Sequence, residues 1–216
     1  PDSWVAVGRH IFECTNMQGL SVGVEICEDL WSMDPPSSSL AQAGATVILN
    51  LSASDEVVGK AAYRRQLVSG QSARLVCGYI YADAGDGEST TDMVFQGHNI
   101  IAENGVILSE ARSGAGIITS ELDLGRLLHD RRRMNTYPPQ STDSDRLIIS
   151  SFSLNLEETE LTRLVARNPF VPSDLMERAE RCGDILDIQC AGLKKRLEHT
   201  GSQSMVVGVS GGLDST

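Results

Sequence analysis

The sequence lacks several patterns that would assign it to a class of protein at once. No apolar stretch approaches the ~20 residues that a membrane-spanning helix needs. The five cysteines form no Cys-x-x-Cys pair, and their odd number suggests neither a disulfide framework nor a zinc site. The pattern Gly-x-x-x-x-Gly-Lys-Ser/Thr is also absent. These absences argue against a membrane-spanning protein, a disulfide-stapled domain and a Walker-type nucleotide site.

Positive charge is scarce as well. The chain has 18 Lys and Arg residues against 29 Asp and Glu residues, a net charge of -11. An acidic chain without a long basic run is a poor candidate for binding nucleic acid or an anionic membrane, so we expect neither partner. The one dense basic cluster, Arg131–Arg133, is interpreted as a solvated helix end. The cysteine usage favours a reducing, cytoplasmic location.

The chain has the composition of a folded protein but an unusual beginning. Its 41% apolar and 22% charged residues are typical of a globular domain. Its 216 residues suffice for one large domain, or for one domain and part of another. The first residues, Pro1-Asp2-Ser3-Trp4, contain neither a methionine nor a signal-like segment. We therefore expect the chain to be an internal piece of a longer protein.

The hydrophobic pattern predicts an α/β fold. Apolar and polar residues alternate over 20–27, with the second face expected to be polar or functional, and a second β-rich run covers 46–51. A short helix at 40–43 between them indicates a βαβ unit with parallel strands. An amphipathic helix is expected at 56–76. Further strands are expected at 77–81, 99–102, 106–109, 116–122 and 146–154, with a polar loop at 84–92 and a helix at 123–133.

The composition of the sequence changes near residue 155. The charged segment 157–167 is expected to be helical, and Pro169–Pro172 reads as a rigid connector. Ser173 is expected to cap a long helix over 174–199 that ends at Gly201. We therefore predict one domain over 1–155, a linker over 156–172 and a second domain from 173 to 216.

Cys27 is the first candidate for chemistry, because it ends the first predicted strand. A nucleophile in that position projects into a cleft above a sheet. A small buried apolar residue is the alternative, and the neighbouring carboxylates of Glu25, Glu28 and Asp29 argue against it. These carboxylates raise the pKa of a thiol, whereas attack needs the thiolate. A catalytic Cys27 therefore needs a cation or base from elsewhere in the chain.

Polar residues after the second predicted strand reach the same sheet edge. Ser52 and Ser54 are placed there to line a cleft with Cys27, because the ends of parallel strands meet at one edge. Lys60 is either a positive charge for a carboxylate or a solvated lysine at a helix end. The loop 86–92 is rich in hydroxyls and carboxylates, and a turn cluster is its simplest interpretation. We assign no metal ligand, because the histidines lack ligand spacing: His10, His98, His129 and His199.

The last seven residues, Ser210–Thr216, follow the expected strand Met205–Val209. A glycine-rich turn after a strand forms a phosphate cradle from backbone N–H groups. Residues 208–212 also match the Gly-x-Ser-x-Gly elbow of serine hydrolases, which needs a later His and acid. Asp214 and the hydroxyls beside it favour phosphate binding.

Taken in order, these motifs resemble those of a known family. Val24–Trp31 resembles the nucleophile segment of nitrilase-superfamily amidohydrolases, and Ser210–Thr216 resembles the pyrophosphate loop of ATP-pyrophosphatase-type synthetases. The ordered set resembles the glutamine-dependent NAD synthetases. It is completed by Asn50–Ser54, Gly87–Asp92, Pro169–Pro172 and Ile188–Leu193.

The resemblance implies a fold and an activity. Residues 1–155 would be the C-terminal part of a nitrilase-like glutaminase domain, an αββα sandwich. Residues 173–216 would be the first helix, strand and phosphate loop of a doubly wound, ATP-binding synthetase domain. Cys27 would hydrolyse glutamine, and the ammonia would pass through a tunnel to amidate nicotinic acid adenine dinucleotide to NAD with ATP. Mg²⁺ and a homo-oligomeric assembly are expected for the full-length enzyme.

The resemblance also implies roles for individual residues. Cys27 would form a thioester with the substrate. The implied substrate-binding residues are Glu28, Trp31, Ser52, Ser54 and Lys60, and the implied ATP-binding residues are Ser210, Gly211, Gly212, Asp214 and Ser215.

The sequence departs from that family's pattern in one respect. The family's glutaminase uses a Glu and a Lys that precede the Cys, whereas only Glu13 precedes Glu25 here and no Lys precedes Cys27. Loss of a general base costs ~10²–10⁴ in rate, so we expect no glutaminase or synthetase turnover from these 216 residues alone. Two other functions stay open: a stand-alone nitrilase-type amidase, and a non-catalytic oligomerisation or regulatory module.

Overall fold

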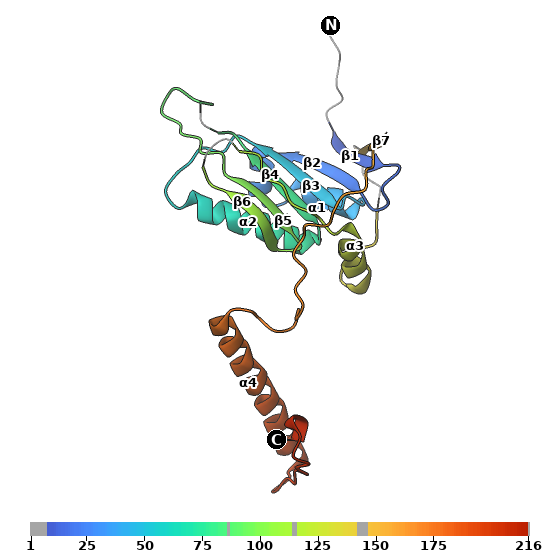
Figure 1. Cartoon of the computed structure of the whole chain (residues 1–216), viewed down its shortest axis with the longest axis vertical. Helices are drawn as coiled ribbons and strands as arrows, with labels where there is room; N and C mark the ends of the chain where they lie inside the picture. Colours follow the sequence, from blue (N-terminus) through green and yellow to red (C-terminus); the bar gives the residue numbers. More distant parts are fainter. Residues whose placement is uncertain (1–7, 86, 114–115, 142–146, 216) are drawn as a thin grey trace. The chain divides into compact units, whose positions relative to one another are not determined.

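The structure of the protein is a computed structural model that describes residues 8–85, 87–113, 116–141 and 147–215. The chain divides into two compact units, one up to Arg163 and the other from Leu164 onward. The first unit is built on a seven-stranded mixed sheet with helices, which confirms the predicted α/β class (Figure 1).

The sheet has the strand order β6-β5-β4-β3-β2-β1-β7. Its centre is parallel, because β2 pairs with β3 and β3 with β4 in parallel, and β1 is also parallel to β7. The other neighbouring pairs are antiparallel. The strands are β1 Arg9–Cys14, β2 Ser21–Ile26, β3 Val47–Ser52, β4 Gly78–Asp83, β5 Asn99–Glu103, β6 Val106–Ala111 and β7 Leu147–Phe152.

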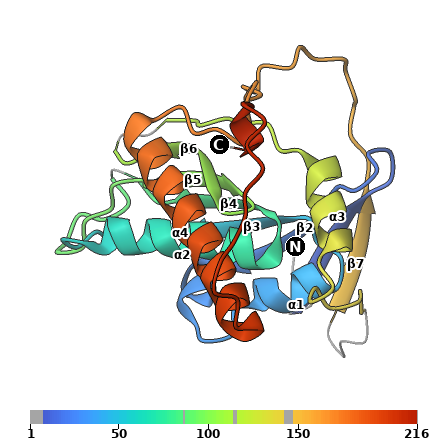
Figure 2. The ribbon, with the colours of Figure 1, turned by 90° about the horizontal axis from the view of Figure 1, so that it is seen from below.

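Helices α1 (Pro36–Gln42) and α2 (Lys60–Leu75) form the two crossovers of this parallel centre. They lie on the same side of the sheet as α3 (Leu124–Arg133), as Figure 2 shows. The predicted βαβ unit is confirmed by the parallel pairing of β2 with β3. As a result, the carboxyl ends of β2, β3 and β4 meet at one edge of the sheet.

The buried face of the sheet carries polar residues as well as apolar ones. Tyr79 is fully buried against the helices, and so is Ile48. Glu25 is only 1% exposed, whereas Ile26 beside it is 64% exposed. The alternation predicted for 20–27 is therefore confirmed, but the helix-covered core lies on the face expected to be polar or functional. Gly23 helps to explain this, because a Cβ at that position would meet the Leu40 Cβ of α1 at 3.1 Å.

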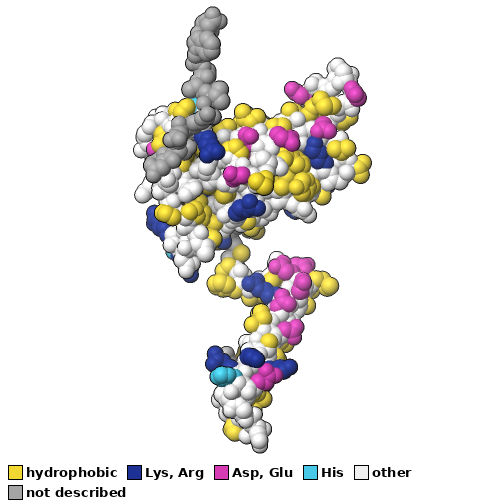
Figure 3. Space-filling model, turned by 180° about the vertical axis from the view of Figure 1, so that it is seen from behind, with side chains coloured by type: hydrophobic (Ala, Val, Ile, Leu, Met, Phe, Trp, Pro, Cys, Tyr) yellow, Lys and Arg dark blue, Asp and Glu magenta, His cyan; other side chains and the backbone are white. Residues whose placement is uncertain are grey.

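The opposite face of the sheet keeps apolar side chains at the surface. Val24 is half-buried, Leu51 is 56% exposed and Phe12 is 37% exposed. Figure 3 shows such hydrophobic side chains (yellow) among the charged ones on one side of the first unit. Antiparallel pairing around Asn104-Gly105 forms the expected hairpin of β5 and β6.

Several expected elements differ from the structure. α1 begins at Pro36 and not at residue 40, because the fixed φ of a proline suits the first helical position. α2 begins at Lys60, four residues later than expected, after the left-handed Gly59. The strand expected at 116–122 is wrong, since residues 116–122 adopt neither strand nor helix and Ile117 is 95% exposed.

The second unit contains one long helix, α4 (Leu175–Thr200). Asp174 and not Ser173 caps it, accepting the N–H of Glu177 at 2.8 Å, and the left-handed Gly201 ends it as predicted. The strand expected at Met205–Val209 is wrong: the segment pairs with no strand, and Val206 is 97% exposed. None of the helices in the described ranges combines the length and the apolar character that crossing a bilayer requires.

The helix expected at 157–167 is also wrong, and carboxylates explain why. Glu121 accepts the backbone N–H groups of Thr162 and Arg163, at 2.9 and 2.6 Å, so these groups are not available to a helix. Arg163 then reaches Glu103 at the end of β5 through two hydrogen bonds of 2.8 and 2.5 Å. Burial alone raises the pKa of Glu103, but the bonds from Arg163 and from the N–H of Asp123 outweigh it and lower the pKa.

This arrangement, which we call the Arg163 clasp (Arg163 with Glu103 and Glu121), predicts a pH-dependent stability. Arg163→Met leaves Glu103, only 4% exposed, as a buried carboxylate without its cation. We expect a loss of about 2 kcal/mol in the free energy of unfolding at pH 7, the order of the cost of leaving a buried acceptor without its donor. A carboxylate whose folded pKa is lowered stabilises above its unfolded pKa and loses that effect as pH falls through the folded pKa. The difference from wild type should therefore be full at pH 7 and should close as pH falls below about 4.

Urea unfolding at pH 7 and at successively lower pH measures this difference. Arg167→Met, at an exposed arginine four residues on, is the matched control and should change little at any pH. A loss that stays constant from pH 7 down to the acid range would contradict the clasp.

Candidate functional site

Cys27 begins a short 3₁₀ helix, η1 (Cys27–Trp31), directly after β2. Its φ of +49° lies in the left-handed region, which costs a residue with a Cβ roughly 1–2 kcal/mol. Asp29 closes the turn, because its Oδ2 accepts the N–H of Ile26 at 2.7 Å. Such a strained residue persists only where the surrounding structure holds it, and strain of this kind clusters at functional sites.

The side chain of Asn50 forms hydrogen bonds with the backbone of Cys27. Its Oδ1 accepts the N–H of Cys27 at 3.2 Å, and its Nδ2 lies 3.4 Å from the carbonyl oxygen of Cys27. Nδ2 also lies 3.3 Å from the hydroxyl of Tyr79, which donates to the carboxylate of Glu25. Burial, with the charge of Glu25, raises the pKa of Tyr79, so that the hydroxyl keeps its proton. The second oxygen of Glu25 accepts the N–H of Ser37 in α1 at 2.8 Å.

A cleft of about 490 Å³ opens at the carboxyl ends of the parallel strands. Cys27 and Ser52 both line it, so the structure brings these two sequence-predicted residues together. The hydroxyl of Ser52 lies 2.6 Å from that of Tyr81. The remaining lining residues are Ile26, Leu51, Ala53, Ala82, Asp83, Ala84 and Glu88.

Three other sequence-predicted residues lie beside η1 or within it. Glu28 is exposed, and Trp31 is half-buried, with its ring 5.4 Å from that of Tyr63. The Nζ of Lys60 lies 5.5 Å from the Trp31 ring and 2.6 Å from Asp55. The hydrogen bond and charge of Lys60 lower the pKa of Asp55. Lys60 is therefore paired with a carboxylate, that of Asp55, and is not a solvated lysine at a helix end.

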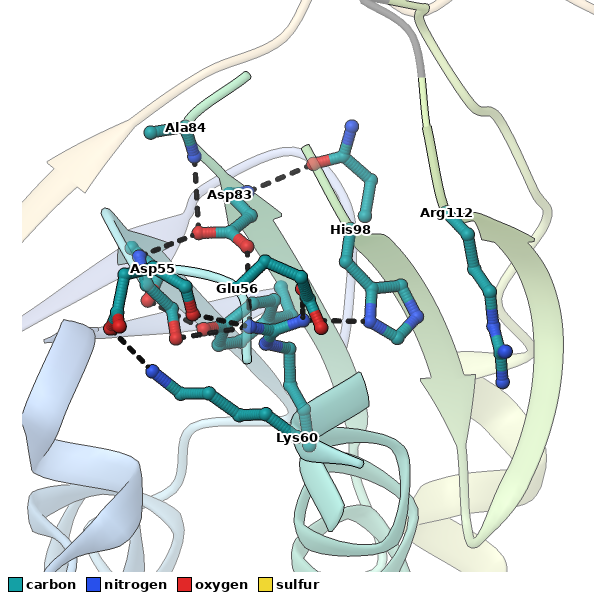
Figure 4. A network of polar contacts seen from close by, with 12 residues as sticks. Asp55, Glu56, Lys60, Asp83, Ala84, His98 and Arg112 are labelled. Atoms are coloured by element: carbon teal, nitrogen blue, oxygen red, sulfur yellow. Dashed lines mark hydrogen bonds and ion pairs between the residues drawn. The ribbon is translucent and has the colours of Figure 1, made fainter. Parts of the chain in front are cut away.

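Ser54 is buried and belongs to a polar cluster around Arg64 of α2. Figure 4 shows this cluster, with its members Glu56, Asp83 and His98 labelled. The guanidinium of Arg64 is fully buried and donates to Ser54 Oγ at 3.1 Å and to Glu56 Oε2 at 2.9 Å. It also lies 3.9 Å from Asp83 Oδ2. Asp83 in turn accepts the N–H of Ser54 at 2.8 Å, which ties the end of β4 to the loop after β3. Burial raises the pKa of Asp83 against the lowering effect of that bond and of Arg64.

His98 extends the same cluster toward β6. Its Nδ1 lies 3.0 Å from Nη1 of Arg64, and its Nε2 lies 2.9 Å from Glu110. Because a guanidinium only donates, Nδ1 must accept, and Nε2 then carries the proton given to Glu110. Burial opposes ionisation of Glu110, but hydrogen bonds from Arg65, His98 and Arg112 lower its pKa to about 2. The walls of the cleft thus rest on a buried polar cluster, in which Arg64 Nε and Asp83 Oδ2 have no hydrogen-bond partner among the described residues.

The C-terminal loop closes on itself. Ser215 Oγ accepts the N–H of Ser210 at 3.0 Å, and the two hydroxyls lie 3.0 Å apart. Gly211 has a left-handed φ of +86°, and Gly212 follows it before the 3₁₀ turn η2 (Leu213–Ser215). The side chain of Asp214 and residue Thr216 lie outside the described part. Within that part, no group of three or more His, Cys, Asp or Glu side chains suits a metal ion.

Sequence reasoning missed Asn50, Tyr79 and Arg64 as components of the site. Asn50 was visible as a polar residue in an otherwise apolar run, Val47–Leu51. Arg64 stands four residues before the buried Val68, so it occupies the inner stripe of α2 and not the solvent face. Both signals exist in the sequence, but the partners of these residues come from distant segments.

The Arg64 cluster makes a prediction about stability. Arg64→Leu removes a fully buried cation and leaves Glu56 and Asp83 without it. We expect a loss of about 3–5 kcal/mol in the free energy of unfolding. The neighbouring Arg65→Leu is the matched control, because Arg65 is half-exposed in its pair with Glu110 and should cost at most about 1 kcal/mol.

Urea unfolding of both variants provides the measurement. Equal losses for the two arginines would contradict the assignment of Arg64 as the centre of a buried cluster.

Comparison with known proteins identifies similar chains. No protein-family model matches the sequence. The chain is 39% identical over 222 residues to the glutamine-dependent NAD(+) synthetase of Mycobacterium tuberculosis (strain ATCC 25618 / H37Rv), covering 98% of this chain and 33% of the relative. It is 30% identical over 209 residues to that of Thermotoga maritima, covering 91% of this chain and 33% of the relative. The chain therefore spans about a third of the length of the curated relatives it matches.

Solved structures give partial matches. A glutamine-dependent NAD+ synthetase from Acinetobacter baumannii, in complex with adenosine diphosphate, matches with a TM-score of 0.44 and 30% identity. That match covers 50% of this chain and 20% of the other. A nitrilase-superfamily member from Saccharomyces cerevisiae matches with a TM-score of 0.47 and 23% identity, covering 54% of this chain and 42% of the other.

Proposed function

Since this chain is homologous over nearly its whole length to about one third of the glutamine-dependent NAD(+) synthetases, we propose that it supplies the glutamine-hydrolysing Cys27 site of such an enzyme. The complete protein would release ammonia from glutamine. It would use that ammonia and ATP to amidate nicotinic acid adenine dinucleotide to NAD. A cytoplasmic location and homo-oligomeric assembly remain predictions.

One observation carries the proposal: Cys27 lines a cleft at the ends of parallel strands, in a left-handed turn that its surroundings hold. In the proposed reaction, Sγ attacks the amide carbon of glutamine after its proton passes to a base. The carbon–nitrogen bond then breaks, and the departing ammonia takes up that proton. Water hydrolyses the thioester to glutamate and restores the thiol. Because no Lys precedes Cys27 in these 216 residues, we assign the activity to the complete protein.

The proposed substrate contacts follow from the cleft. Ser52 lines it with Cys27, and Glu28 begins the exposed side of η1. The Nζ of Lys60 lies 5.5 Å from the Trp31 ring, and we propose that the two receive the substrate's carboxylate, with Lys60 exchanging its partner Asp55 for it. Ser54 is buried, so its contribution to substrate binding would run through the loop that it anchors. Glutamine, with one carboxylate and one ammonium group, suits these opposite charges.

We propose that the second unit begins the site that consumes the ammonia. Residues 1–155, 156–172 and 173–216 would be glutaminase domain, linker and start of the synthetase domain. The half-exposed apolar face of the sheet is the feature that supports a partner layer and hence an αββα sandwich. Mg²⁺ would screen the ATP phosphates, but the side chain that suits it best, Asp214, lies outside the described part. The proposed ATP-binding residues remain Ser210, Gly211, Gly212, Asp214 and Ser215.

The test of this function replaces the proposed nucleophile in the complete protein. Cys27→Ala should lower glutamine-driven NAD formation by about 10³-fold or more, because the thioester cannot form. The ammonia-driven reaction should survive, since it bypasses glutamine hydrolysis. Both rates are followed by NAD formation with saturating ATP and dinucleotide.

Cys77→Ala is the matched control. Cys77 is fully buried away from the cleft, and burial raises its pKa to about 12, so that it stays a thiol. Its removal should leave both reactions within a few-fold of wild type. Glutamine-driven turnover that survives Cys27→Ala would overturn the proposed function.

A further inference from the structure

We infer that Asn50 is a positioning residue for Cys27: its side-chain amide holds both backbone polar groups of that residue and so fixes where the thiol lies in the cleft. This inference rests on the proposed role of Cys27 as a nucleophile. Asn50 itself lies on the helix-covered face of the sheet, is 1% exposed and does not line the cleft.

Strand β2 leaves the sheet directly before Cys27. Its last paired residues are Glu25, opposite Asn50, and Ile26, opposite Leu51. At Cys27 the chain turns away with a φ of +49°, so its backbone groups have no strand partner. The amide of Asn50 takes the place of that missing backbone, accepting from the Cys27 N–H and donating to the Cys27 carbonyl. A single side chain therefore satisfies both backbone groups of a residue in the left-handed region.

The orientation of the amide is itself fixed. Only an amide with its oxygen toward the Cys27 N–H leaves the NH₂ group facing two oxygens, the Cys27 carbonyl and the Tyr79 hydroxyl. The Tyr79 hydroxyl can accept there, because its proton is committed to Glu25. Glu25 is held in turn by the N–H of Ser37 in α1. The hydrogen bonds therefore run in one direction: Asn50 donates to the Tyr79 hydroxyl, and that hydroxyl donates to the carboxylate of Glu25.

This geometry separates the two faces of the site. Cys27 and Ser52 line the cleft, whereas Asn50 does not line it and its amide bonds the backbone of Cys27. Loss of the amide should therefore misplace the attacking sulfur and leave the substrate-binding side chains in place. A misplacement of about 1 Å can cost 10²-fold in rate, so kcat should fall and KM should change little.

Two variants of Asn50 test the inference in the complete protein. Asn50→Leu removes both hydrogen bonds to the Cys27 backbone and replaces the amide with an apolar side chain of similar volume. Asn50→Asp keeps an acceptor for the Cys27 N–H but turns a carboxylate oxygen toward two oxygens. For both, we expect kcat of glutamine-driven NAD formation to fall about 10²-fold, with KM for glutamine within about threefold and the ammonia-driven rate unchanged.

Thr46→Val is the matched control, because Thr46 makes a comparable clamp at the other end of the same strands. Its buried hydroxyl donates to the Gly19 carbonyl at 2.7 Å and lies 3.2 Å from the N–H of Ser21. It should lose stability, measured by urea unfolding, and keep its kcat. Tyr79→Phe removes only the hydroxyl behind Asn50, and it should lower kcat by roughly tenfold even if Asn50→Leu fails to fold.

A second measurement needs no turnover: the rate at which iodoacetamide alkylates Cys27, followed across pH. In Asn50→Asp the added carboxylate should move this pH profile upward, because a nearby negative charge disfavours the thiolate. Thr46→Val should leave the profile unchanged. A kcat within threefold of wild type in both Asn50→Asp and Tyr79→Phe, with an unmoved alkylation profile, would overturn the inference.

Failure of the proposed function would look different. Wild-type protein would then show no glutamine-driven NAD formation, while the alkylation profiles of Asn50→Asp and Thr46→Val would still report whether the amide governs the thiol.

Discussion

Burying a polar group without a partner is costly, and this cost shapes the polar interior of the first unit. The helix-covered face of the sheet carries the carboxylate of Glu25, the amide of Asn50 and the hydroxyl of Tyr79 among its apolar residues. Their partners come from η1 and α1, so satisfying them fixes where those elements lie. The same need for partners ties Arg64 of α2 to the ends of β3 and β4. The walls of the cleft are thus held by hydrogen bonds that run beneath them.

The order of strands and helices could be predicted from the sequence wherever local residues determine the structure of a segment. The parallel pairing of β2 and β3 follows from two β-rich runs joined by a short helix, and Gly201 ends α4 because it alone tolerates the left-handed cap without strain. The sequence is a poor guide where the outcome depends on a partner. Residues 157–167 have a helical composition, but Glu121 captures two of their N–H groups.

The candidate site divides in the same way. Cys27 and Ser52 could be placed at one edge from strand order alone, because that is a matter of topology. The role of Asn50 depends on the left-handed turn at Cys27, and the role of Ser54 depends on the buried Arg64. Ser54 and Arg64 are ten positions apart, and Asn50 and Tyr79 are 29 positions apart. No local spacing of residues encodes such contacts.

The backbone angle at Cys27 has a consequence for any effort to engineer this protein. Glycine is the residue that a φ of +49° favours, so replacing Cys27 by glycine would relieve strain at one of the least comfortable positions of the fold. A selection for heat resistance alone would favour this replacement, and it would remove Cys27, the one cysteine among the described residues that line the cleft. Stability and chemistry therefore compete for the same residue, which marks Cys27 as a position to hold fixed while the rest of the chain is improved.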